Sequence, residues 1–261
     1  MGFKFKKRYG QNFLTQVSIT RRIAQVIEEK ENSLALEIGC GDGRLTRQLC
    51  KLYTRVIGYE IDKEVIPYLY NNLKGENNCV IICSDFLDRD LEKDLFTYKY
   101  KKLYIFGNLP YYITTPIIEK LINSKLNIDE MVFMVQKEVA DRFTAKTGTK
   151  EYGSLTVYLN YFYDVKKEFF VSRKNFEPMP NVDSAVVSFK RKENMIRAND
   201  EQLFFKLIKD SFTHKRKTLK NNLEGYKLDK VLEILQRHDL DLSVRAEKLP
   251  LEIFIEIANN L

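Results

Sequence analysis

The feature that most constrains the fold is an alternation of short apolar runs with longer mixed segments between residues 34 and 135. The segments between the runs, such as Lys63–Leu73 and Thr115–Ile122, have helical spacing. Strands that alternate with helices form βαβ units, so we expect a mostly parallel sheet with both faces covered. Continuous apolar runs also suit strands that are buried on both sides. The strand-like runs are Leu34–Ile38, Arg55–Glu60, Cys79–Cys83, Leu103–Phe106 and Met131–Val135.

The pattern changes after Ala185–Phe189, which is the last strand-like run. Residues 190–199 are mostly charged or polar, and the chain beyond them has apolar residues at helical spacing. The three helical segments are Gln202–Phe212, Leu228–Gln236 and Leu251–Ala258. We therefore predict an α/β, Rossmann-like domain over residues 1–190, which includes an N-terminal arm at 1–15, and a small all-α domain over 191–261.

The charge of the chain is positive and unevenly spread. The net charge is +7, and the basic residues form one group near the N-terminus and one in the predicted helical domain. Basic clusters of this kind favour a polyanionic partner, nucleic acid first, while a solvated face that aids solubility is the alternative. The residues that we predict to contact RNA are Lys6, Lys7, Arg8, Lys215, Arg216 and Lys217.

The remaining composition excludes several classes of protein. The four cysteines and two histidines are scattered without metal-ligand spacing, so we expect a reduced, intracellular protein without a metal site. No apolar run approaches membrane-spanning length, and the charged N-terminus lacks the apolar core of a secretory signal. We expect a cytoplasmic protein that does not associate with membranes.

A glycine turn follows the first predicted strand. Gly39, Gly41 and Gly43 form a G-x-G-x-G pattern, which resembles motif I of S-adenosylmethionine methyltransferases more than a dinucleotide fingerprint. Glu60 ends the next strand, where a carboxylate binds both ribose hydroxyls, and Asp85 follows the third, where it accepts a hydrogen bond from adenine. A turn glycine or a helix cap is the alternative for each residue alone. Three successive strand ends at one sheet edge favour a cofactor site.

The fourth strand end carries Asn-Leu-Pro-Tyr at residues 108–111. The lone pair of an adenine amine is delocalised into the ring, and it becomes localised when the Asn108 side chain and the Leu109 carbonyl accept the two amine hydrogens. Pro110 fixes the local backbone, and Tyr111 offers a ring on which a base stacks. Positioning and electrostatics then carry methyl transfer without a strong general base.

These motifs resemble those of the ribosomal RNA adenine dimethyltransferase family. The Asn108–Tyr111 motif is similar to motif IV of methyltransferases that act on adenine. Further similarity lies in the stretches 10–14, 135–142, 176–187 and 211–219, and the motifs occur in the family's order between residue 8 and about residue 223. The resemblance implies S-adenosylmethionine as the methyl donor and S-adenosylhomocysteine as the product.

The resemblance also implies roles for individual residues. It places Asn12, Leu14, Gly39, Gly41, Glu60, Asp85 and Asn108 at the cofactor. It places Asn108, Leu109, Pro110 and Tyr111 at the reacting amine, and Tyr111 and Phe176 on the two faces of a flipped adenine.

Two branches of the family remain as alternatives. The small-subunit dimethyladenosine transferases (KsgA type) dimethylate two adjacent adenines in the 3′-terminal hairpin of small-subunit RNA, and the Erm type modifies a large-subunit adenine and confers macrolide resistance. The sequence Asn-Leu-Pro-Tyr-Tyr-Ile-Thr from residue 108 favours the small-subunit type. The partner is then ribosomal RNA within an immature small subunit, and we expect a monomer. A non-catalytic ribosome-assembly factor is the alternative from another class.

Overall fold

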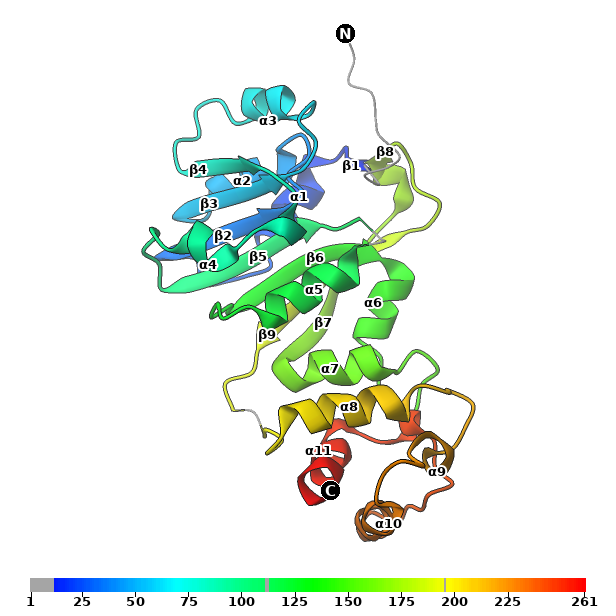
Figure 1. Cartoon of the computed structure of the whole chain (residues 1–261). Helices are drawn as coiled ribbons and strands as arrows, with labels where there is room; N and C mark the ends of the chain where they lie inside the picture. Colours follow the sequence, from blue (N-terminus) through cyan, green and yellow to red (C-terminus); the bar gives the residue numbers. More distant parts are fainter. Residues whose placement is uncertain (1–11, 111–112, 195) are drawn as a thin grey trace. The chain divides into compact units, whose positions relative to one another are not determined.

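The computed structural model describes residues 12–110, 113–194 and 196–261 (Figure 1). Seven strands form one sheet in the order β4-β3-β2-β5-β6-β9-β7, and β1 and β8 form a separate antiparallel pair. The strands are β1 (Phe13–Leu14), β2 (Ser33–Ile38), β3 (Arg55–Glu60), β4 (Cys79–Cys83), β5 (Lys102–Asn108), β6 (Glu130–Gln136), β7 (Tyr163–Val171), β8 (Phe176–Glu177) and β9 (Ser184–Arg191).

The sheet is mostly parallel, as the alternating pattern predicted. The pairs β2–β3, β3–β4, β2–β5 and β5–β6 are parallel, and β9 runs antiparallel to β6. The chain moves outward from β2 to β3 and β4 and then returns to the other side of β2 as β5. Ligands of open α/β sheets bind at such a reversal of strand order, beyond the carboxyl ends of the strands.

Burial explains why the central strands read as continuous apolar runs. All six residues of β2 are buried, and so are the five interior residues of β5 and of β6. Helices that follow the strands have amphipathic sequences, as expected for helices that cover a sheet. The helices are α1 (Val17–Ala24), α2 (Arg44–Cys50), α3 (Ile66–Asn72), α4 (Leu91–Leu95), α5 (Thr114–Asn123), α6 (Lys137–Phe143), α7 (Ser154–Phe162), α8 (Glu201–Ser211), α9 (Leu219–Asn222), α10 (Leu228–Arg237) and α11 (Leu251–Asn260). Short 3-10 helices span Phe86–Asp88 (η2), Arg173–Asn175 (η3) and Ala246–Lys248 (η4).

The chain divides into two compact units, and their boundary differs from the predicted one. The first unit contains Met1–Ala140 and Lys166–Lys190, and the second contains Asp141–Val165 and Arg191–Leu261. The predicted boundary near residue 190 therefore placed residues 141–165 in the wrong domain.

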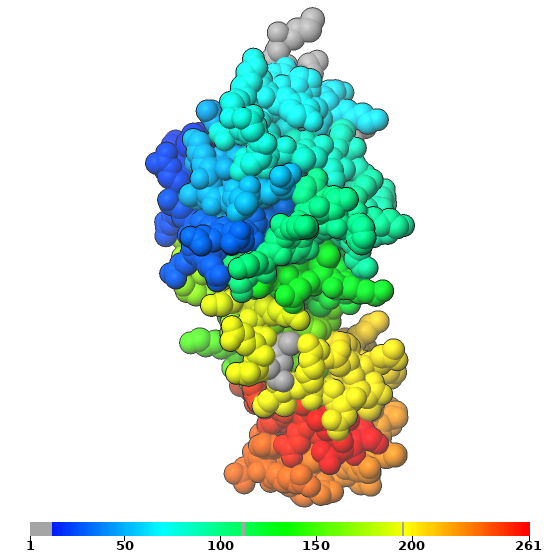
Figure 2. Space-filling view, turned by 90° about the vertical axis from the view of Figure 1, so that its left-hand side faces the viewer, coloured from blue at the N-terminus to red at the C-terminus, as the bar shows by residue number. Residues whose placement is uncertain are grey.

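The aromatic side chains of α7 explain this difference. Tyr161 is buried in the core of the second unit, its ring centroid is 4.6 Å from that of Phe204 in α8, and its hydroxyl donates to Glu201 (2.9 Å). Burial of aromatic rings stabilises α7 within the helical unit. The C-terminal part of the second unit, coloured orange to red, lies together in Figure 2. Across the described ranges, we find no helix with the length and apolarity that a membrane span requires.

Candidate active site

The carboxyl ends of the four parallel strands β4, β3, β2 and β5 lie level with one another. Ile38, the last residue of β2, is opposite Tyr59 of β3 and Gly107 of β5. Glu60 is opposite Cys83 at the end of β4. The residues that follow these positions therefore emerge at one edge of the sheet, as the sequence predicted.

A pocket lies at this edge, within the first unit. The predicted residues that line it are Asn12, Leu14, Gly39, Gly41, Glu60, Asp85, Asn108, Leu109, Pro110 and Phe176. Residues that sequence reasoning did not assign to the site also line it, among them Phe13, Thr20, Glu37, Asp42, Arg44, Phe86 and Leu87. The structure thus brings together ten of the predicted residues and adds a second set around them.

The glycine turn after β2 presents bare backbone to the pocket. Gly39 and Gly41 have φ angles of +76° and +56°, in the left-handed region that side chains rarely adopt. A Cβ at Gly39 would meet nothing within 4 Å, whereas a Cβ at Gly41 would lie 2.6 Å from the Phe13 ring. The space in front of Gly39 is therefore open to a ligand, and Gly41 is packed under the N-terminal arm.

Glu60 holds the glycine turn from the neighbouring strand. One carboxylate oxygen accepts a hydrogen bond from the Gly41 N–H (2.7 Å), and the other accepts from the Asp62 N–H (2.8 Å). Burial raises the pKa of Glu60, while both backbone bonds favour the ionised form. Each carboxylate oxygen retains a second lone-pair site, so Glu60 is able to accept from ligand hydroxyls as well.

Glu37 is the most informative residue that sequence reasoning missed. It lies within β2, is 1% exposed, and its Oε2 accepts no hydrogen bond from the described residues. Burial raises the pKa of Glu37 to about 8. A carboxylic acid in the middle of an apolar strand was the available signal, because acids are rarely fully buried without a structural or functional reason.

Asp85 lies between β4 and the short helix η2. Its Oδ1 accepts from the Leu87 N–H (2.9 Å), so Asp85 caps this helix while it also lines the pocket. The cap uses one carboxylate oxygen. Capping and ligand binding are therefore compatible roles, although they stood as alternatives in the sequence.

The Asn108 turn presents oxygen acceptors. The Asn108 side-chain nitrogen donates to the Asn12 carbonyl (3.0 Å), and this bond fixes the orientation of the amide. The amide oxygen accepts no hydrogen bond from the described residues. Leu109 is anchored by its N–H, which donates to the Met134 carbonyl (3.1 Å), and its own carbonyl accepts from none of the described donors. The Pro110 carbonyl is occupied by Thr114 (3.1 Å). Two acceptors thus remain for a ligand amine.

Phe176 and the N-terminal arm form one wall of the pocket. In the β1–β8 pair, Leu14 is opposite Phe176, and both side chains are buried and line the pocket. Arg44 donates to the Leu14 carbonyl and so fastens the arm to the start of α2. The wall therefore places an aromatic ring beside the pocket.

The remaining predicted residues lie elsewhere. Tyr111, Lys6, Lys7 and Arg8 fall outside the described residues. Lys215, Arg216 and Lys217 are exposed in the turn between α8 and α9 of the second unit. Their charges are therefore available to a partner.

Comparison with known proteins decides the family. The family model described as "Ribosomal RNA adenine dimethylase" matches residues 2–261. The chain belongs to this family. Among its relatives, ribosomal RNA small subunit methyltransferase A of Streptococcus pneumoniae is 42% identical and covers 100% of this chain and 93% of the relative. The protein of the same name from Listeria welshimeri is 41% identical, with coverages of 100% and 92%.

Solved structures of adenine dimethylases and related enzymes have the same fold. A dimethyladenosine transferase from Plasmodium falciparum has a TM-score of 0.79 and 28% identity, and the match covers 94% of this chain and 95% of that one. The 23S rRNA methyltransferase ErmE has a TM-score of 0.78 at 24% identity, over 96% and 99% of the two chains. The predicted Rossmann-like methyltransferase fold is confirmed.

The pocket fits the methyl donor of the adenine dimethylases. S-adenosylmethionine supplies the methyl group when it is bound, and the predictions of an enzyme and of this cofactor are confirmed by the family. The Glu37 Oε2, which accepts no hydrogen bond from the described residues, and the open space before Gly39 are features that a bound ligand would complete. Glu60 and Asp85 would hold its ribose and adenine.

Proposed function

We propose that this protein dimethylates the exocyclic N6 of two adjacent adenines in the 3′-terminal hairpin of small-subunit ribosomal RNA. The observation that carries the proposal is a pair of oxygen acceptors at the Asn108 turn, to which no described residue donates. The turn lines the same pocket as Glu60 and Asp85. The relatives that match across the whole chain are named as small-subunit methyltransferases, which favours this substrate over a large-subunit one.

The acceptors suit a neutral amine. The Asn108 amide oxygen and the Leu109 carbonyl would each accept one hydrogen of the adenine amine, so that its lone pair points at the methyl donor. The pocket must accept the amine and then its monomethyl form, which has one hydrogen left to donate. Phe176 would stack on one face of the flipped ring, and Tyr111 is proposed for the other face.

The exposed basic residues Lys215, Arg216 and Lys217 would bind RNA phosphates, which position a substrate without reading its sequence. Lys6, Lys7 and Arg8 are proposed for the same role. Replacing Lys215 and Lys217 by Ala should weaken RNA binding and reduce its salt dependence, because phosphate contacts release counterions. Binding of S-adenosylhomocysteine should not change.

We infer that the substrate is the RNA within an immature small subunit, that the protein acts as a monomer, and that it is cytoplasmic. Incubating it with S-adenosylmethionine and either naked RNA or immature small subunits, followed by mapping of dimethyladenosine, tests the substrate. Label on two adjacent adenines of small-subunit RNA is expected. Label on large-subunit RNA would favour Erm-type methylation, and ribosome binding without any label would favour an assembly factor.

A further inference from the structure

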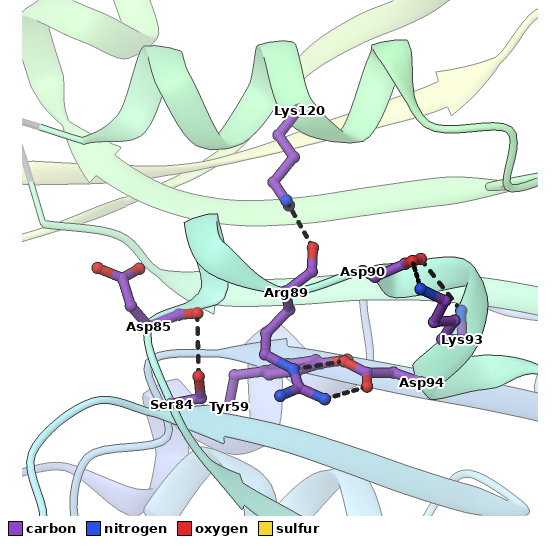
Figure 3. Close-up of polar contacts among 8 residues, drawn as sticks. All are labelled: Tyr59, Ser84, Asp85, Arg89, Asp90, Lys93, Asp94 and Lys120. Atoms are coloured by element: carbon purple, nitrogen blue, oxygen red, sulfur yellow. Dashed lines mark hydrogen bonds and ion pairs between the residues drawn. The ribbon is translucent and has the colours of Figure 1, made fainter.

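A lysine on α5 holds the loop that carries Asp85. The Lys120 ammonium donates to the carbonyls of Leu87 (2.9 Å) and Arg89 (2.7 Å), as Figure 3 shows for Arg89. Its Nζ is also 6.0 Å from the centroid of the Phe86 ring. Among the described residues, no acidic side chain forms an ion pair with Lys120. This half-buried charge is therefore satisfied by the backbone of one loop.

The loop and the helix that Lys120 joins lead to different parts of the pocket. Leu87 lines the pocket, and its N–H donates to Asp85, whose carboxylate points away from Lys120 in Figure 3. Helix α5 begins four residues after Pro110, and the Thr114 hydroxyl at its start donates to the Pro110 carbonyl (3.1 Å). A short chain of contacts therefore joins the Asp85 loop to the Asn108 turn.

The far end of the same loop is fixed separately. Arg89 binds Asp94 through two hydrogen bonds, of which the Nε–Oδ2 bond is 2.9 Å, and the Tyr59 hydroxyl donates to Asp94 (2.9 Å). The bond from Arg89 lowers the pKa of Asp94, so this carboxylate stays ionised at neutral pH. Arg89 is therefore held through Asp94 to Tyr59 of β3, while the bond from Lys120 to the Leu87 carbonyl joins α5 to the part of the loop nearer Asp85.

We propose that Lys120 is a positioning residue that sets the selectivity of the pocket for the adenine end of the methyl donor. It does not touch the ligand, and it acts by fixing the loop that aims Asp85. This inference rests on the role proposed for Asp85 as the acceptor of the adenine amine. An ammonium serves this purpose because it has three N–H donors and is able to bind both carbonyls at once.

The test compares two ligands that differ at the adenine amine. S-adenosylhomocysteine has the amine, and S-inosylhomocysteine has an oxygen in its place, so the ratio of their dissociation constants reports the contact with Asp85. We expect S-inosylhomocysteine to have the higher dissociation constant. In Lys120→Met, its dissociation constant divided by that of S-adenosylhomocysteine should be about fivefold to tenfold lower than in the wild type, the effect of losing one aligned hydrogen bond. Lys125→Met, the same change at an exposed position two residues beyond α5, should leave the ratio unchanged.

Three results would decide against the inference. If Lys120→Met weakens both ligands equally, Lys120 has only a structural role and the inference is wrong. If Asp85→Ala narrows the ratio and Lys120→Met does not, the inference alone fails. If Asp85→Ala leaves the ratio unchanged, the role of Asp85 fails and the inference fails with it, whatever the methylation assay shows. Should Lys120→Met not fold, Lys120→Arg should narrow the ratio in the same direction by less.

Discussion

The pocket has an acidic half and a half without charged side chains among its described lining residues. The half at the ends of β2, β3 and β4 is lined by the acids Glu37, Glu60 and Asp85, together with Asp42. The half formed by the Asn108 turn, the start of α5 and Phe176 has no acid among its described lining residues, which are Asn108, Leu109, Pro110, Ile113, Ile117 and Phe176.

This difference matches the two substrates of the reaction. S-adenosylmethionine carries a sulfonium and an ammonium, and nearby carboxylates favour positive charge. An adenine amine is neutral before transfer, and carbonyl oxygens orient it without changing its protonation. We therefore expect the acidic half to govern cofactor affinity and the neutral half to govern the rate of methyl transfer. The following substitutions test that division.

The largest effect is expected from Asn108→Ala. Loss of the amide oxygen leaves the amine poorly oriented and its lone pair delocalised, so kcat should fall about a hundredfold to a thousandfold, as for loss of one oriented group at a reacting centre. Affinity for S-adenosylhomocysteine should change much less. Single-turnover methylation and equilibrium binding measure the two quantities, and Asn123→Ala at the exposed end of α5 is the matched control. Equal losses in rate and affinity would contradict the division.

Glu37 should give the acidic half a pH dependence. Its pKa is about 8 in the folded protein against an ordinary value of 4.5. Between these values the folded state holds a proton that the unfolded state has lost, so the free energy of unfolding should fall as pH rises from 4.5 to 8 and level off outside that window.

Glu37→Gln should remove this slope. The difference in unfolding free energy between the variant and the wild type should therefore increase by roughly 2–4 kcal/mol from pH 5 to pH 8. This figure is the free energy that corresponds to the shift in the pKa of Glu37. Urea unfolding of both proteins over that range measures the difference, and the contributions of titrating groups that do not interact with Glu37 cancel in it. Parallel curves for the two proteins would show that Glu37 is ionised throughout.

Glu60→Gln tests whether the Glu60 carboxylate contributes to cofactor affinity, both directly and by holding the glycine turn. The amide replaces one acceptor oxygen by a donor, which then faces the N–H of Gly41 or Asp62. Affinity for S-adenosylmethionine should fall about tenfold to a hundredfold, since bonds to a charged acceptor are each worth about 1.5–3 kcal/mol. Isothermal titration measures it, with Glu92→Gln on the exposed face of α4 as control. Unchanged affinity would exclude Glu60 from the cofactor site.

The sequence predicted six strands because each has a run of apolar residues. In β2, β3, β5, β6 and β9 that run reflects burial, whereas the edge strand β4 is apolar but only partly buried. The three that it missed have other causes. β1 and β8 are two residues long and exist through the pairing of Leu14 with Phe176, which lie far apart in the chain. β7 is partly exposed and interrupted by charged residues such as Lys166 and Glu168, so it lacks a continuous apolar run.

The site was predictable where a residue type must follow a strand end. Gly39, Glu60, Asp85 and Asn108 all lie where the parallel register puts them. Glu37 is visible in the sequence as an acid within an apolar strand, but only the fold shows that it lines a pocket. Lys120 was hidden because its partners are backbone carbonyls, which leave no mark in a sequence.

The smallest effects should come from the two glycines, and they separate folding from binding. Gly39→Ala and Gly41→Ala both place a side chain in the left-handed region, which costs about 1 kcal/mol each. Gly41→Ala also drives its Cβ into the Phe13 ring, so it should lower the thermal midpoint more. Gly39→Ala has free space and should lower it less, yet its methyl group occupies the surface that the methyl donor approaches. Ligand binding should therefore raise the midpoint of Gly41→Ala more than that of Gly39→Ala, and the reverse order would show that the donor does not approach Gly39.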